Sequence, residues 1–170
     1  ALPFEGNKTE VYTDGLSMLQ SLMKAISKAK HHIHLEFYIF EDDPVGRLLR
    51  DLLIDKAREG VEIRLLYDDV GCWKVPHLLY DEMRGAGIEA RGFLKVRFPV
   101  FTSKVNYRNH RKIVVIDGKV AFTGGMNIAL RYMKGFQWGI WRDTHIEIEG
   151  KAVYGLQTAF LTDWYVVDRT

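Results

Sequence analysis

Apolar residues along this chain switch between the ~3.6-residue spacing of helices and the shorter spacing of strands. The first helical pattern follows Asp14, a residue that suits the N-cap position. Its predicted buried face consists of Leu16, Leu19, Leu22, Met23 and Ile26. The second helix has Asp43 as N-cap and Pro44 at its first position, and Gly60 follows its end. Its predicted buried face consists of Leu48, Leu49, Leu52 and Leu53.

Strands are predicted between the helices, and two further helices over 76–84 and 152–167. Segments with strand-like composition cover 9–12, 33–40, 61–67, 88–90, 113–116, 120–123 and 145–148. Gly118 lies between two of them and predicts a hairpin, whose strands must be antiparallel. Because strands and helices alternate elsewhere, we expect an α/β fold, a layered α/β/α sandwich with a mixed β-sheet. Residues 1–170 then form a single domain.

Composition agrees with one globular domain and narrows the function. Apolar residues make up 47% of the 170-residue chain and charged residues 27%, which excludes a disordered protein. The formal net charge of +2 gives no strong overall basic field, so nucleic acid is a disfavoured partner. The single cysteine, Cys72, excludes an internal disulfide. No apolar run reaches the ~18 residues that a membrane span needs.

Two segments break the regular pattern. Residues 93–108 combine four basic residues with aromatic and aliphatic ones, and the wider stretch 90–116 contains no Asp or Glu. Residues 129–141 hold two tryptophans and two further basic residues. We interpret 93–108 either as a loop with solvated charges or as a lip that meets anionic lipid headgroups.

His110 and Lys112 carry the strongest chemical signal. Their two-residue spacing puts both side chains on one face of a strand. An imidazole beside an ammonium suits a phosphate, because the lysine neutralises anionic oxygens while the histidine attacks phosphorus or donates a proton. Taken alone, the pair is more typical of a solvated strand face. The glycines Gly124 and Gly125 allow close backbone approach to a ligand, and Asn127 adds an amide donor, so the complete pattern favours chemistry.

This pattern resembles the signature of the phospholipase D superfamily. The matching residues are the His110-x-Lys112 pair, Asp117 and the Gly-Gly-x-Asn sequence over 124–127. The neighbourhood is also similar to the first catalytic half of bacterial cardiolipin synthases. The segments that carry this similarity are 34–40, 106–112, 122–128, 141–145 and 160–165. The resemblance implies a phospholipase D-like fold over nearly the whole chain.

The resemblance also implies a role for each motif residue. His110 is the nucleophile that forms a phosphohistidine, and Lys112 and Asn127 bind the phosphoryl oxygens. Asp143 matches the carboxylate that hydrogen-bonds the other ring nitrogen of that histidine and fixes its tautomer. The resemblance places Asp117 among the catalytic residues of the motif. Because it lies beside Gly118, we expect it to brace the turn. No metal and no cofactor is implied.

Other residues are expected to line the substrate pocket. They are Gly124, Gly125, Arg108, Glu36 and Tyr38. The superfamily often has serine where this chain has Gly125, whereas cardiolipin synthases commonly have glycine. His32, His34 and Glu36 alternate on one strand face and could hold a metal. We favour the alternative, in which this strand packs one face on a helix and the histidines are capped or exposed at an edge.

The resemblance implies phosphatidyl transfer, in which two phosphatidylglycerols give cardiolipin and glycerol. Members of the subfamily carry two motifs behind N-terminal membrane helices, whereas this chain has one motif and no such helix. We therefore expect half of a two-motif enzyme, completed by a second half or a homodimer mate, with the bacterial parent at the cell membrane and this fragment soluble. Two alternatives stay open: a single-motif homodimeric phosphodiesterase or nuclease, and a catalytically silent fragment that binds phosphate or lipid.

Overall fold

The computed structural model describes residues 5–69, 71–72, 74–93, 110–134, 139 and 142–169. Its strands are β1 (Lys8–Tyr12), β2 (His32–Phe37), β3 (Glu62–Asp68), β4 (Glu89–Phe93), β5 (Ile113–Ile116), β6 (Val120–Gly124) and β7 (His145–Glu149). Its helices are α1 (Gly15–Ser27), α2 (Pro44–Arg58), α3 (His77–Gly85), α4 (Leu130–Lys134) and α5 (Val153–Asp168). Every predicted strand and helix is present, and α4 is an addition.

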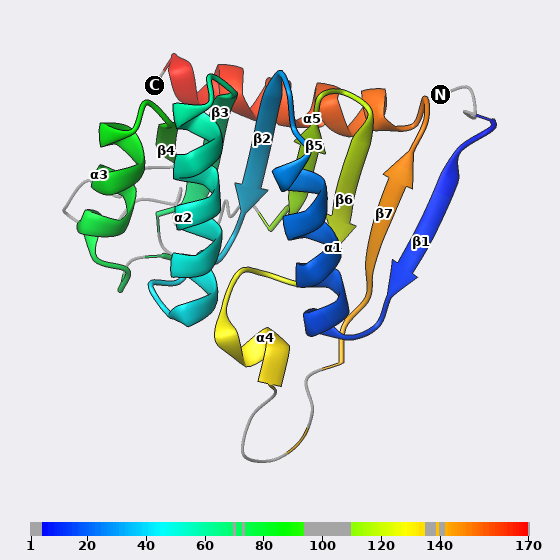
Figure 1. Cartoon of the computed structure of the whole chain (residues 1–170), viewed down its shortest axis with the longest axis horizontal. Coiled ribbons are helices and arrows are strands. Elements are labelled where there is room, and N and C mark those ends of the chain that lie inside the picture. The colour runs from blue at the N-terminus through cyan, green and yellow to red at the C-terminus, as the bar shows by residue number, and fades with distance from the viewer. Residues whose placement is uncertain are drawn as a thin grey trace, which may run out of the picture.

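The strands form one seven-stranded mixed sheet in the order β1-β7-β6-β5-β2-β3-β4. β2, β3 and β4 are parallel, while the pairs from β2 to β5 and onward to β1 are antiparallel. Figure 1 shows α1, α2 and α3 on one face of the sheet and α5 across the other. The predicted α/β/α sandwich and the antiparallel hairpin around Gly118 are confirmed.

Two predicted core positions are wrong. Leu16 on α1 is 54% exposed and Leu48 on α2 is 49% exposed. On α1, Leu19, Leu22 and Ile26 are buried as predicted, while Met18 is buried in place of Leu16. An exposed leucine is common on a folded surface, which is why apolar character alone does not settle helix orientation.

Aspartate caps begin both long helices on the first face. Asp14 accepts a hydrogen bond from Ser17 N at 2.8 Å. Asp43 Oδ1 accepts from Val45 N and Gly46 N, both at 2.9 Å. The second oxygen of Asp43 accepts from Leu130 N, the first residue of α4. The start of α4 therefore depends on a residue 87 positions away, a signal absent from its local sequence.

The turn between β5 and β6 is anchored by Asp117. Its carboxylate accepts from the backbone N–H groups of Lys30, His31 and His32 at 2.7–3.0 Å. The residue itself has a positive φ of 53°. Burial alone would raise the pKa of this carboxyl, but the three N–H donors outweigh burial and lower it. The side chain therefore ties the hairpin to the start of β2.

None of the helices in the described ranges combines the length and the apolar content that crossing a bilayer requires.

Replacing Asp117 with alanine is expected to lower the free energy of unfolding by about 1–2 kcal/mol, because three N–H groups lose a charged acceptor. The stabilisation by the carboxylate is present above the ordinary Asp pKa of about 4 and is lost as pH falls through the lower folded value. Asp117→Asn is the matched control, since asparagine also tolerates positive φ but does not titrate. Urea unfolding at about pH 7 and about pH 3 measures both effects. An alanine variant as stable as the parent at neutral pH would contradict this account.

Candidate active site

Several motif residues meet at one edge of the sheet. β5 begins where β2 ends, with Ile113 paired to Glu36. β7 begins where β6 ends, with His145 paired to Gly124. The residues just before β5 and β7 and just after β6 therefore gather at this edge. Asp117 lies at the opposite end of β5, where it contacts the start of β2. Its contacts are those of a turn brace.

His110 and Lys112 meet at the ring of Tyr38. The His110 imidazole stacks on this ring, with centroids 4.2 Å apart and planes 22° apart. Lys112 Nζ lies 6.0 Å from the same ring centroid and donates to His110 O at 2.7 Å. The two side chains are therefore close, as their spacing predicts, although the strand itself begins only at Ile113. Burial lowers the pKa of Lys112, and the Asp143 carboxylate opposes this shift.

Asp143 packs against the glycine pair. Its carboxylate accepts from Thr144 N at 2.7 Å. A Cβ at Gly125 would collide with this carboxylate, so glycine permits the close contact. Among the described residues, Asp143 forms no hydrogen bond with His110. The orienting role expected for Asp143 therefore stays a prediction. Gly124 has a φ of 156°, and a Cβ there would collide with Thr144 O and His145 Cα.

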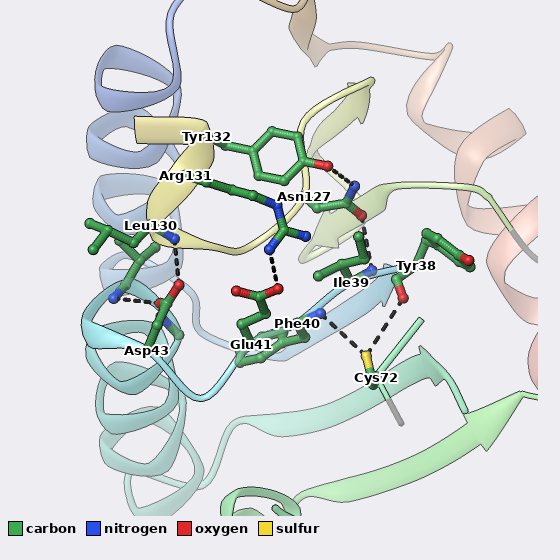
Figure 2. Close-up of polar contacts among 12 residues, drawn as sticks. Tyr38, Ile39, Phe40, Glu41, Asp43, Cys72, Asn127, Leu130, Arg131 and Tyr132 are labelled. Atoms are coloured by element: carbon green, nitrogen blue, oxygen red, sulfur yellow. Dashed lines mark hydrogen bonds and ion pairs between the residues drawn. The ribbon is translucent and has the colours of Figure 1, made fainter. Parts of the chain in front are cut away.

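Asn127 is buried, and both ends of its side-chain amide bond to groups of the protein. The side chain is 3% exposed. Figure 2 shows its amide between two elements: Oδ1 accepts from Ile39 N at 3.0 Å, and Nδ2 donates to Tyr132 Oη at 2.9 Å. The amide of Asn127 therefore bonds to Ile39 and Tyr132 of the same chain. Its expected contact with a phosphoryl oxygen stays a prediction.

Two other expected pocket residues lie on or just after β2. Tyr38 stacks on His110, and Glu36 is buried in β2, where its charge acts on Arg111, the residue between His110 and Lys112. The pocket role of Glu36 stays a prediction. Arg108 lies outside the described residues, as does the predicted lip except for Phe93.

The histidines of β2 pack against α5. Gln157 bridges them: its Oε1 lies 3.1 Å from His32 Nε2 and its Nε2 lies 2.8 Å from His34 Nδ1. His34 also stacks on Phe160, with ring centroids 4.6 Å apart. The packing of this strand face on a helix and the bonds from Gln157 agree with the alternative favoured from the sequence, while His34 is buried rather than exposed at an edge. Across the described ranges, no group of three or more potential metal ligands comes together.

His145 is a residue of this edge that sequence reasoning missed. It is 1% exposed, and its Nδ1 has no hydrogen-bond partner in the part of the chain that the structure describes. Burial lowers its pKa to about 4. The charge of Asp143 raises this pKa by a smaller amount, and the charge of Lys112 lowers it further. His145 lacks a neighbouring lysine and asparagine in sequence, and only the pairing of β6 with β7 brings it to the motif.

A groove of about 500 Å³ opens beside the pair. Its polar wall includes His110, Lys112 and Thr144. The apolar wall consists of Ile113, Ile146, Leu156 and Ala159. Cationic and apolar surfaces side by side suit a phosphodiester that carries an apolar group.

The sequence matches the family model described as cardiolipin synthase, PLD-like domain, over residues 22–164. The cardiolipin synthase of Alkalihalophilus pseudofirmus is 48% identical over 160 residues, which cover 94% of this chain and 32% of that protein. The major cardiolipin synthase ClsA of Bacillus subtilis is 44% identical over 161 residues, or 94% of this chain and 33% of that protein. The chain therefore spans about a third of the length of these curated relatives.

Two solved structures share the fold. Nuc, a phospholipase D family member from Salmonella typhimurium, superposes with a TM-score of 0.69 at 17% identity, over 94% of this chain and 95% of Nuc. Phosphatidylserine synthase from Haemophilus influenzae Rd KW20 superposes with a TM-score of 0.71 at 16% identity, over 91% of this chain and 36% of that one. The phospholipase D-like fold expected from the sequence is confirmed.

The free energy of unfolding is expected to fall as pH drops from about 6.5 toward about 4. Burial lowers the pKa of both His34 and His145 to about 4, so the unfolded chain takes up these protons first. Above about pH 6.5 both histidines are neutral in the folded and the unfolded chain, and the free energy of unfolding has its full value. At about pH 5 each histidine lowers this free energy by about 2 kcal/mol. Urea unfolding at about pH 7 and about pH 5 measures the loss.

In His145→Leu, the loss between pH 7 and pH 5 should shrink by the share of this histidine. His31→Gln is the control, because His31 lies in an exposed loop. A His145→Leu variant with the full pH dependence of the parent would show that His145 titrates normally in the fold.

Proposed function

This chain belongs to the family described as cardiolipin synthase, PLD-like domain, and from that premise we propose that it is one catalytic half of a phospholipase D-type phosphatidyltransferase. The complete protein would make cardiolipin from two phosphatidylglycerols and release glycerol. The curated relatives, named cardiolipin synthases, support this choice of substrate. The observation that carries the proposal is the meeting of His110 and Lys112 at one aromatic ring, beside a groove with an apolar wall.

The proposed reaction has two displacements at phosphorus. A ring nitrogen of His110 attacks the phosphorus of phosphatidylglycerol, and the bond from phosphorus to the glycerol oxygen breaks. A second histidine gives that oxygen a proton, and glycerol leaves. A hydroxyl of another phosphatidylglycerol then attacks the phosphohistidine and gives its proton to the second histidine. The phosphorus–nitrogen bond breaks and His110 is restored.

Lys112 would stabilise the phosphoryl oxygens through both displacements. Its ammonium is half-buried, where a charge acts on a phosphate more strongly than it does in bulk water. The same partial burial is the cause of its lowered pKa.

We further propose that the second histidine comes from a partner half. In-line displacement needs the nucleophile and the acid on opposite sides of phosphorus, and this sequence contains one copy of the motif. The chain spans about a third of its relatives, so a second motif within the complete protein or a second copy of the chain would supply the acid. We place the complete protein at the bacterial cell membrane, where its lipid substrate resides.

His110→Asn and Lys112→Gln, each introduced into the complete protein, are expected to lower cardiolipin formation on phosphatidylglycerol vesicles by about 10³-fold or more. The parent should release glycerol and form cardiolipin in equal amounts. His77→Asn is the control, because this exposed histidine lies on α3, away from the motif. Circular dichroism checks that each variant folds. Phosphatidic acid as the main product would favour the phosphodiesterase alternative, and full activity in His110→Asn would reject the nucleophile.

The isolated 170-residue chain is expected to turn over only where two copies associate. Initial rates of the chain, measured against its concentration on the same vesicles, should rise with the square of concentration. Sedimentation at the same concentrations reports the monomer fraction. A constant turnover per chain among demonstrated monomers would contradict the shared-site mechanism. A complete lack of turnover in the associated chain would favour the silent binding fragment.

A further inference from the structure

Tyr38 provides the ring contact of His110 among the described residues. The histidine is exposed and precedes β5, so no strand hydrogen-bond ladder fixes its backbone. Among the described residues, its side chain forms no hydrogen bond, and its ring contact is the stack on Tyr38. An exposed side chain without such a contact samples several rotamers, and a nucleophile in the wrong rotamer is misaligned with phosphorus.

Cys72 holds one side of the Tyr38 backbone. Its Sγ lies 3.5 Å from Tyr38 O as donor and accepts from Phe40 N at 3.3 Å. Burial raises the pKa of the Cys72 thiol, so the sulfur keeps the proton that it donates. Gly71 contributes space, because a Cβ at this position would collide with Tyr38 O and lie 3.1 Å from Cδ2 of the ring.

The Gly-Gly-x-Asn segment holds the other side. Asn127 Oδ1 accepts from Ile39 N, and Ile128 N donates to Ile39 O at 3.1 Å. Glu41 N donates to Ile128 O at 2.9 Å, and the Glu41 carboxylate pairs with Arg131. Figure 2 shows the Asn127–Ile39 bond, the Glu41–Arg131 pair and the two contacts of Cys72 around the residues that follow β2. The segment that carries Tyr38 is therefore attached to its neighbours at Tyr38 O and at the three residues that follow.

From these contacts we propose that Tyr38 is the positioning residue of the site, a role that rests on the proposed function. Its ring covers one face of the His110 imidazole, which leaves the in-plane ring nitrogens open to phosphorus. The Lys112 ammonium lies 6.0 Å from the same ring centroid, so one ring sets the positions of both motif side chains. Asn127 acts on His110 through Ile39 and Tyr38, in addition to any contact with substrate.

Tyr38→Leu tests the role of the ring in the complete protein. We expect kcat on phosphatidylglycerol vesicles to fall roughly ten- to hundred-fold, with KM changed by less than about three-fold, because alignment is lost while phosphate binding remains. Tyr38→Phe keeps the ring and should stay within about two-fold of the parent. Tyr154→Leu is the matched control, the same substitution at an exposed tyrosine of α5. Tyr38→Met serves as a second non-aromatic variant if the leucine variant does not fold.

Histidine NMR of the 170-residue chain gives a readout independent of turnover. The His110 ring resonances, assigned by their absence in His110→Asn, should carry a ring-current shift from Tyr38. That shift should vanish in Tyr38→Leu and persist in Tyr38→Phe. Loss of kcat together with loss of the shift supports the proposal. An unchanged shift, or a leucine variant as active as the parent, would overturn it.

The two proposals fail in different ways. A parent that forms no cardiolipin would reject the proposed function, while the NMR comparison would still report the contact between Tyr38 and His110. A parent that needs His110 for cardiolipin formation but is indifferent to Tyr38→Leu would keep the function and reject the positioning role. A rise in KM without a change in kcat would also reject it, because that result assigns Tyr38 to substrate binding.

Discussion

Antiparallel pairing between β2 and β5 is the constraint on which the site depends. β2 also pairs in parallel with β3, so it joins the parallel half of the sheet to the antiparallel half. Because the two strands run in opposite directions, the exit of β2 lies beside the entrance of β5. Tyr38 and His110 occupy these two chain ends and stack there. Asp117 supports the same pairing at its other end, where it binds the backbone at the start of β2.

Local signals predicted most of the fold. The Asp14 and Asp43 caps, the β-branched run over 113–116 and the turn at Gly118 each act over a few residues, and each element forms where its signal lies. The misses have non-local causes. α4 begins at an amide held by a distant carboxylate, and β2 ends at Phe37, short of the predicted 40, because the following residues bond to Cys72 and to the segment after β6.

The site was predictable to the extent that sequence spacing sets proximity. The two-residue spacing of His110 and Lys112 anticipated their closeness. The structural contacts of Asn127 and the burial of His145 depend on strand register, which the spacing of residues along one segment does not contain. The position of Glu36 on β2 likewise did not indicate that its charge acts on Arg111, which lies on another segment of the chain.

The carboxylate of Asp43 serves two helices at once, because one oxygen caps α2 and the other holds the first amide of α4. Serine and asparagine cap an isolated helix about as well as aspartate does. Each of them offers a single side-chain acceptor atom, so each would keep the cap of α2 and leave Leu130 N without this acceptor. Protein engineers who treat N-cap residues as interchangeable should therefore exempt this position, where the second oxygen couples two helices.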